Sequence, residues 1–183
     1  MKRILIFISI VIITTLVALS CERDDICAET TATTPRLIIT FFDINDRDEP
    51  KNVRQLEIKG IGDDGVPIED NIILARTNTD SIALPLRFQA EGEITTSRFE
   101  LVRSADYIGN DNESLNENRD VIEITYTPEF IYVSRACGYK SIFDLGTTGG
   151  ITREADDDNW IIDFDILNET IDNESAAHIS IYH

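Results

Sequence analysis

Short runs of alternating apolar and polar residues, separated by turn-forming residues, recur along most of this chain. An alternation of period two places successive side chains on opposite faces, which is the pattern of a half-buried β-strand. After the first twenty residues, no stretch of ten or more residues has the apolar period of a helix. The sequence therefore predicts an all-β domain of about eight to ten short strands.

The expected strands all lie within residues 36–183, which we take as one domain. They are Arg36–Asp43, Val53–Ile61, Ile72–Leu74, Ser81–Phe88, Thr96–Arg103, Asp120–Thr127, Glu129–Cys137, Lys140–Leu145, Trp160–Ile166 and Ala177–His183. The first has apolar residues on both faces and is expected to be central. Pro85 removes a backbone donor, which indicates an edge strand, and Gly62–Gly65 predicts a turn. The expected fold is an antiparallel β-sandwich, immunoglobulin-like in general form, with a partly open β-barrel as the alternative.

The N-terminus has the features of an export signal. Lys2 and Arg3 precede an apolar run, Ile4–Leu19, that is too short to span a bilayer comfortably. Small residues then lead directly to Cys21, and this arrangement resembles the lipobox of bacterial lipoproteins. We expect residues 1–20 to be a lipoprotein signal peptide and Cys21 to carry the lipid. An ordinary signal peptide with a coincidental cysteine, or an uncleaved anchor, is the alternative.

With Cys21 lipidated, Cys27 and Cys137 remain. An exported chain is in an oxidising compartment, so the two are expected to form a disulfide, with two buried free thiols as the alternative. Closing a loop of about 110 residues stabilises a fold by about 4.7 kcal/mol in the loop-entropy treatment. Cys137 ends the run Glu129–Cys137, which we expect to be a buried strand that turns at Gly138. Residues 21–35 form the lipid-anchored lead-in.

The charge of the chain excludes one class of partner. Loss of residues 1–20 removes two of the 16 basic residues and none of the 34 acidic ones, which leaves a net charge of −20. Nucleic-acid binding needs a basic surface, so it is not expected. The same charge disfavours adhesion of the protein surface to anionic lipid.

No catalytic constellation is recognisable, and no cofactor is expected. His178 and His183 are an odd number of residues apart on one expected strand, so they face opposite sides. Two acidic clusters have oxygen ligands of the kind that calcium prefers, without the spacing of a known calcium loop. They are Asp156, Asp157, Asp158 and Asn159, and Asp43, Asn45, Asp46 and Asp48. Near the expected disulfide, Arg135, Tyr139 and Lys140 are candidate contacts for an anionic ligand, although packing and ion pairing are the simpler roles.

Four segments of the mature chain together resemble a family of lipoproteins of Bacteroidota (flavobacteria). They are Cys21–Cys27, Thr33–Ile39, Val133–Lys140 and Ala177–His183. The resemblance implies an outer-membrane lipoprotein with a domain of unknown function, and both Cys27 and Cys137 belong to the family's pattern. Glu22, Asp24 and Asp25 resemble a surface-export signal of that phylum, so either the periplasmic or the cell-surface face is expected.

We therefore expect a non-catalytic lipoprotein, anchored in the envelope, that binds a partner protein or a surface glycan. A calcium-dependent binding module is one alternative, and a hydrolase with a pair of carboxylates is another.

Overall fold

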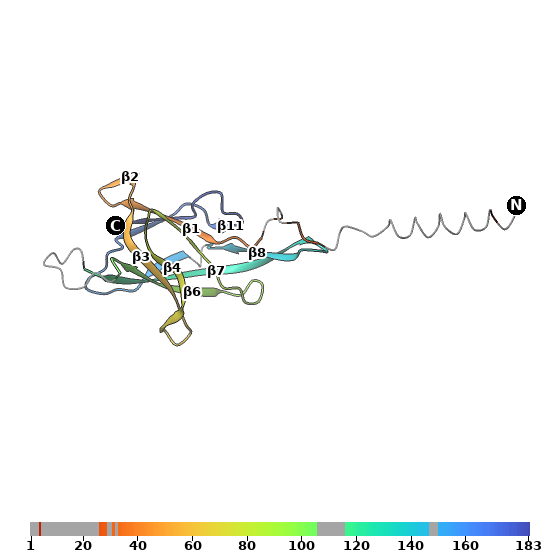
Figure 1. Cartoon of the computed structure of the whole chain (residues 1–183), viewed down its shortest axis with the longest axis horizontal. Helices are drawn as coiled ribbons and strands as arrows, with labels where there is room; N and C mark the ends of the chain where they lie inside the picture. Colours follow the sequence, from red (N-terminus) through yellow and green to blue (C-terminus); the bar gives the residue numbers. More distant parts are fainter. Residues whose placement is uncertain (1–3, 5–25, 29–30, 32, 106–115, 147–149) are drawn as a thin grey trace. The chain divides into compact units, whose positions relative to one another are not determined.

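The computed structural model describes residues 4, 26–28, 31, 33–105, 116–146 and 150–183. Cys21 and the expected signal peptide therefore lie outside the described residues, except for Ile4. The described part is built from β-strands (Figure 1). These are β1 (Leu37–Asp43), β2 (Asp46–Pro50), β3 (Val53–Ile61), β4 (Pro67–Thr79), β5 (Ser81–Leu84), β6 (Thr95–Arg103), β7 (Asn118–Ser134), β8 (Gly138–Asp144), β9 (Gly150–Arg153), β10 (Asp163–Ile166), β11 (Thr170–Ile171) and β12 (Ile179–Tyr182). No helix among these residues is long and apolar enough to cross a membrane.

The strands form two sheets. One has the order β10-β12-β1-β2, with β5 also paired to β1, and the other has the order β11-β8-β7-β6-β3-β4, with β9 also paired to β7. Figure 1 shows β7 as the long strand beside β6 and β8. Each sheet is open, because the first and last strands of its order do not pair with each other. Two open sheets are what a β-sandwich requires, so that prediction is confirmed. One pair differs from the antiparallel rule, since the C-terminal strand β12 runs parallel to β1.

A single hydrophobic core joins the two sheets. The alternate residues Leu37, Ile39 and Phe41 of β1 are fully buried. They belong to one cluster with Ile122 and Ile124 of β7, which are also fully buried. The alternation in the sequence identified the inward-facing side chains of β7, because burial of one face of a sheet requires it. Strand β1 has apolar residues on both faces and is central as expected, but only one of its faces is fully buried.

Four of the expected strands differ from the structure at their ends. Two of them, Asp120–Thr127 and Glu129–Cys137, merge into one continuous strand, β7, which ends at Ser134. The third, Ser81–Phe88, ends as a strand at Leu84, just before Pro85, and Phe88 is 64% exposed rather than inward-facing. Trp160–Ile166 is a strand only from Asp163.

The buried strand expected at Glu129–Cys137 is wrong. Strand β6 accompanies β7 only from Asn118 to Tyr126, so β7 extends beyond this neighbour. Tyr132 is 58% exposed as a consequence of that extension. Apolar residues without a covering layer stay in solvent whatever their pattern.

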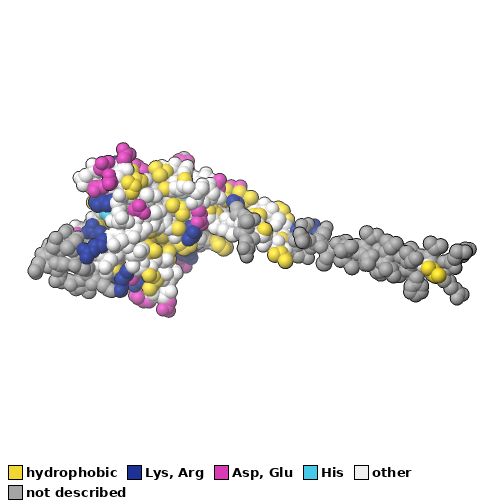
Figure 2. Space-filling view, turned by 45° about the horizontal axis from the view of Figure 1, so that its top comes forward, with side chains coloured by type: hydrophobic (Ala, Val, Ile, Leu, Met, Phe, Trp, Pro, Cys, Tyr) yellow, Lys and Arg dark blue, Asp and Glu magenta, His cyan; other side chains and the backbone are white. Residues whose placement is uncertain are grey.

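The chain divides into two compact units. The smaller unit comprises residues 1–31 and 132–139, and the larger comprises residues 32–131 and 140–183. The hydrophobic core described above belongs to the larger unit. Acidic side chains are spread over several parts of the face shown in Figure 2, with basic side chains among them.

Candidate functional site

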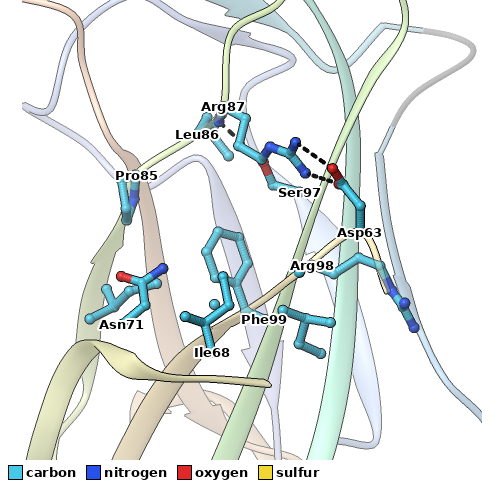
Figure 3. Close-up of a pocket in the computed structure, with 13 residues that line it drawn as sticks. Asp63, Ile68, Asn71, Pro85, Leu86, Arg87, Ser97, Arg98 and Phe99 are labelled. Atoms are coloured by element: carbon cyan, nitrogen blue, oxygen red, sulfur yellow. Dashed lines mark hydrogen bonds and ion pairs between the residues drawn. The ribbon is translucent and has the colours of Figure 1, made fainter. Parts of the chain in front are cut away.

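A cavity of about 540 Å³ opens on the larger unit, where β3, β4 and β6 meet the segment after β5. That volume lies in the range of small-molecule sites. The residues that line it are Gly60, Ile61, Gly62, Asp63, Ile68, Asn71, Ile73, Pro85, Leu86, Arg87, Ser97, Arg98 and Phe99. Figure 3 shows the Phe99 ring between the Asn71 side chain and the polar pair made by Asp63 and Arg87.

A glycine makes room for the polar side chain on one wall of this cavity. Gly60 of β3 lies opposite Phe99 of β6 in the antiparallel register. A Cβ atom at Gly60 would lie 2.6 Å from the amide nitrogen of Asn71, which is too close for any real contact. A side chain at residue 60 would therefore displace the Asn71 amide from its position on the cavity wall.

The rim of the cavity carries an ion pair. One guanidinium nitrogen of Arg87 lies 2.6 Å from Asp63 Oδ1, and the other lies 3.4 Å from Oδ2. The neighbouring Asp64 accepts a hydrogen bond from the N–H of Val66 and so forms the turn, which leaves Asp63 for the arginine. The hydrogen bond from Arg87 lowers the pKa of Asp63, so the carboxylate stays ionised.

A closed ring of three hydrogen bonds holds the backbone of Arg87. The Tyr126 hydroxyl donates to the Arg87 carbonyl at 2.5 Å, and the Arg87 N–H donates to Ser97 Oγ at 3.2 Å. Ser97 Oγ and Tyr126 Oη are 2.7 Å apart, so the serine hydroxyl donates to the tyrosine oxygen. Burial raises the pKa of Tyr126, which keeps its donor proton in place. The two buried side chains therefore position the cation of the rim.

The second arginine of the lining has a structural role. Figure 3 shows the Arg98 side chain directed away from the other labelled residues. Its guanidinium forms ion pairs with Glu154 and with Glu123. The charges at the cavity are thus internally compensated, since each lining arginine has an acidic partner.

The expected disulfide is present. Cys27 and Cys137 are bonded, with their Cα atoms 4.8 Å apart and a sequence separation of 110. Cys21, the expected lipid site, lies outside the described residues.

The three candidate ligand contacts near the disulfide, Arg135, Tyr139 and Lys140, have separate surroundings in the structure. Arg135 is exposed, and the Tyr139 ring packs edge-on against Tyr132 with the centroids 5.4 Å apart. Lys140 belongs to the larger unit, where its Nζ donates to the carbonyl of Asp172 at 3.3 Å.

Both histidines are packed into the larger unit. His178 Nδ1 accepts a hydrogen bond from the backbone N–H of Ile38 at 3.0 Å. The ring of His183 packs edge-on against those of Phe41 and Trp160, at 6.1 and 5.6 Å. Burial lowers the pKa of both imidazoles. These contacts are structural ones.

The acidic clusters use their oxygen atoms to build turns. Asp156 Oδ1 accepts from the N–H of Asp158 at 2.8 Å, and Asp43 Oδ1 accepts from the N–H of Asn45 at 2.8 Å. In the part of the chain that the structure describes, no group of three or more His, Cys, Asp or Glu side chains is arranged to hold a metal ion.

Sequence reasoning missed the cavity as a site, although it located the Gly62–Gly65 turn that forms part of the rim. The signals were present in Gly60 and in Pro85, the first inside a strand and the second at a strand end. Neither signal specifies that a hollow lies between them, because that depends on how β4 departs from β3 through several register shifts.

The sequence model of one family, DUF6452, described as a family of unknown function, matches residues 55–183. All the residues that line the cavity lie within this match. No curated protein and no solved structure matches the chain.

Proposed function

This chain belongs to the DUF6452 family, and we propose that it is a non-catalytic lipoprotein of the bacterial outer membrane that binds a short, neutral glycan. The observation that carries the ligand class is the cavity beside Phe99, with the Asn71 amide on its wall and the Asp63–Arg87 pair on its rim. The anchor rests on the sequence around Cys21.

The side chains of the cavity suit a sugar. Amide, carboxylate and guanidinium groups bind hydroxyl groups as acceptors and donors, and the exposed apolar side chain of Ile68 suits the C–H groups of a pyranose ring. Because Asp63 and Arg87 neutralise each other, the site offers no net charge to an ion. The net charge of −20 on the mature chain also disfavours an acidic ligand.

The cavity favours binding over hydrolysis. Asp63 is the one carboxylate among the residues that line it. Cleavage of a glycosidic bond by the usual route requires two carboxyl groups, one of them protonated. The low pKa of Asp63 leaves it without a proton to donate.

The test of the ligand class is a titration of the purified mature protein with neutral and acidic oligosaccharides by calorimetry. We expect a neutral oligosaccharide to bind, and Asn71→Ala to weaken that binding by about tenfold, which corresponds to about 1.4 kcal/mol. Asp70→Asn is the matched control, because Asp70 is exposed on the same strand and does not line the cavity. Equal affinity of the Asn71→Ala and wild-type proteins, or binding of acidic sugars alone, would contradict the proposal.

The test of the anchor is the intact mass of the protein from native envelopes. We expect an N-terminal acylated cysteine, and we expect Cys21→Ala to move the protein from the membrane fraction to the soluble fraction. A mature chain without acyl mass would refute the anchor and leave the glycan proposal standing. Calcium at millimolar concentration should not shift the thermal midpoint, whereas a calcium module would be stabilised.

A further inference from the structure

The described part of the smaller unit carries little charge. Its described residues are 4, 26–28, 31 and 132–139. Among them Arg135 is the single charged side chain, and none is Asp or Glu. The unit also contains Glu22, Asp24, Asp25 and Glu29, which lie outside the described residues, so the low charge is a property of the hairpin end, residues 132–139.

The same unit exposes large apolar and aromatic side chains. Ile26 is 83% exposed, Tyr132 is 58% exposed and Tyr139 is 70% exposed. The two tyrosine rings pack edge-on against each other at 5.4 Å, beside the disulfide that holds this end of the hairpin. A tyrosine has an apolar ring and a polar tip, and such side chains favour the boundary between water and lipid.

The length of the N-terminal segment limits where this unit can lie. Five residues separate Cys21 from Cys27. At about 3.3–3.6 Å per extended residue, they reach no further than about 20 Å. If Cys21 is lipidated, Cys27 lies within that distance of the bilayer, and the disulfide, with its Cα atoms 4.8 Å apart, holds Cys137 close to Cys27.

We propose that the end of the β7–β8 hairpin rests in the headgroup region of the membrane that holds the lipid of Cys21, with Tyr132 and Tyr139 in the interface and Arg135 on a lipid phosphate. This inference rests on the lipid anchor proposed above. Glu22, Asp24 and Asp25 adjoin the anchor and repel anionic lipid, so the partner is a bilayer of zwitterionic headgroups. The uncharged tyrosines provide the contact there.

The experiment uses the acylated protein in phosphatidylcholine vesicles, with and without lipids brominated near the carbonyl group, which quench nearby tryptophan fluorescence. Trp160 is the one tryptophan of the chain, and it is buried, so the wild-type protein gives the background signal. Tyr139→Trp places a second tryptophan in the exposed pair. Phe88→Trp is the control, because Phe88 is also exposed and belongs to the larger unit.

We expect brominated lipid to remove at least half of the added fluorescence of Tyr139→Trp and iodide in the buffer to have little effect on it. We expect the opposite for Phe88→Trp. Flotation of the same vesicles reports the anchor separately. A protein that floats but whose Tyr139→Trp fluorescence is quenched by iodide and not by brominated lipid would overturn the hairpin contact alone. A protein that does not float would overturn the anchor, and the hairpin proposal with it.

A double variant, Tyr132→Ser with Tyr139→Ser, tests the membrane contact of the hairpin end without a new fluorophore. Tyr132→Ser with Tyr139→Ser should increase the rate at which a protease cleaves the anchored chain after Arg135 by several-fold in vesicles. In detergent-free solution of the Cys21→Ala protein, the same substitutions should leave that rate within twofold. Equal protection of the wild-type and double-serine proteins in vesicles would overturn the proposal.

Discussion

The carboxylate of Asp120, on β7, accepts a 2.8 Å hydrogen bond from the backbone N–H of Ile161. Its other oxygen accepts from the N–H of Trp160 at 3.3 Å. Asp120 is fully buried, so these donors replace the water that an ionised side chain would otherwise bind. The pair fixes a segment without strand structure against the core. It thereby holds the Trp160 ring 6.2 Å from that of Phe41.

Replacement of Asp120 by alanine should lower the free energy of unfolding by about 3 kcal/mol, because two buried backbone donors lose their acceptor. Asp120→Asn keeps one side-chain oxygen and should cost less. Urea denaturation monitored by Trp160 fluorescence measures both changes. Asp157→Ala, at an exposed residue of the neighbouring turn, is the control and should stay within about 0.5 kcal/mol of wild type. If Asp120→Ala also stayed within about 0.5 kcal/mol of the wild-type free energy of unfolding, the role assigned to this carboxylate would be contradicted.

The pH dependence of the same variants tests the burial of the charge. Burial raises the pKa of Asp120 above the ordinary 3.8, so this carboxyl group keeps its proton to a higher pH in the folded state than in the unfolded chain. The stability that this group contributes is full below pH 3.8 and is lost as the pH rises through the folded pKa. The free energy of unfolding of the wild type should therefore fall relative to that of Asp120→Asn as the pH rises from 3.8 through the folded pKa. A constant difference between the two proteins would show that the carboxyl titrates as in the unfolded chain.

His178 should make the larger unit sensitive to mild acid. Burial lowers its pKa below 6.5, so the unfolded chain takes up a proton first, and stability is lost as the pH falls from 6.5 through the folded pKa. A protonated ring also cannot accept the hydrogen bond from the Ile38 N–H.

The matched variant is His178→Asn, whose side-chain oxygen can accept that bond without titrating. Its thermal midpoint should fall less than that of wild type between about pH 8 and pH 5. His183 is present in both proteins, so its own lowered pKa cancels from the comparison. Parallel curves for the two proteins would exclude His178 as the source of the acid sensitivity.

The sequence predicted the sandwich because burial of one sheet face leaves a period of two, as in Ile122, Ile124 and Tyr126. It could not predict the direction of β12, since alternation reads the same for parallel and antiparallel neighbours. Nor could it predict the exposure of Tyr132, which depends on where the neighbouring strand ends. The cavity was missed because its parts, such as Asn71 and Arg87, come from separate segments that only the sheet geometry brings together.

Ser97 should support both stability and the cavity. Ser97→Ala removes the acceptor of the Arg87 N–H and the donor to Tyr126, which should lower the free energy of unfolding by about 1–3 kcal/mol. Tyr126→Phe breaks the same ring and should cost a similar amount, while the edge-on packing against Phe143 remains. Phe88→Ala is the control at an exposed residue. If the two losses add fully in the double variant, the three hydrogen bonds do not act as one ring.

The disulfide should stabilise the fold mainly by restricting the unfolded chain. Its half-cystines are 110 residues apart, and a loop of that length corresponds to about 4.7 kcal/mol of stabilisation in the loop-entropy treatment. Measured stabilisation by a disulfide is often smaller than this treatment gives. Cys27→Ser with Cys137→Ser should therefore lower the free energy of unfolding by about 2–4 kcal/mol in urea. The wild-type protein under reducing conditions should match the double variant, and the double variant itself should not respond to reductant.

Because the disulfide lies in the smaller unit, the urea dependence should be followed both by Trp160 fluorescence and by proteolysis after Arg135. A loss seen only by proteolysis would mean that the disulfide stabilises the hairpin end locally and contributes little to the larger unit, contrary to the loop-entropy prediction.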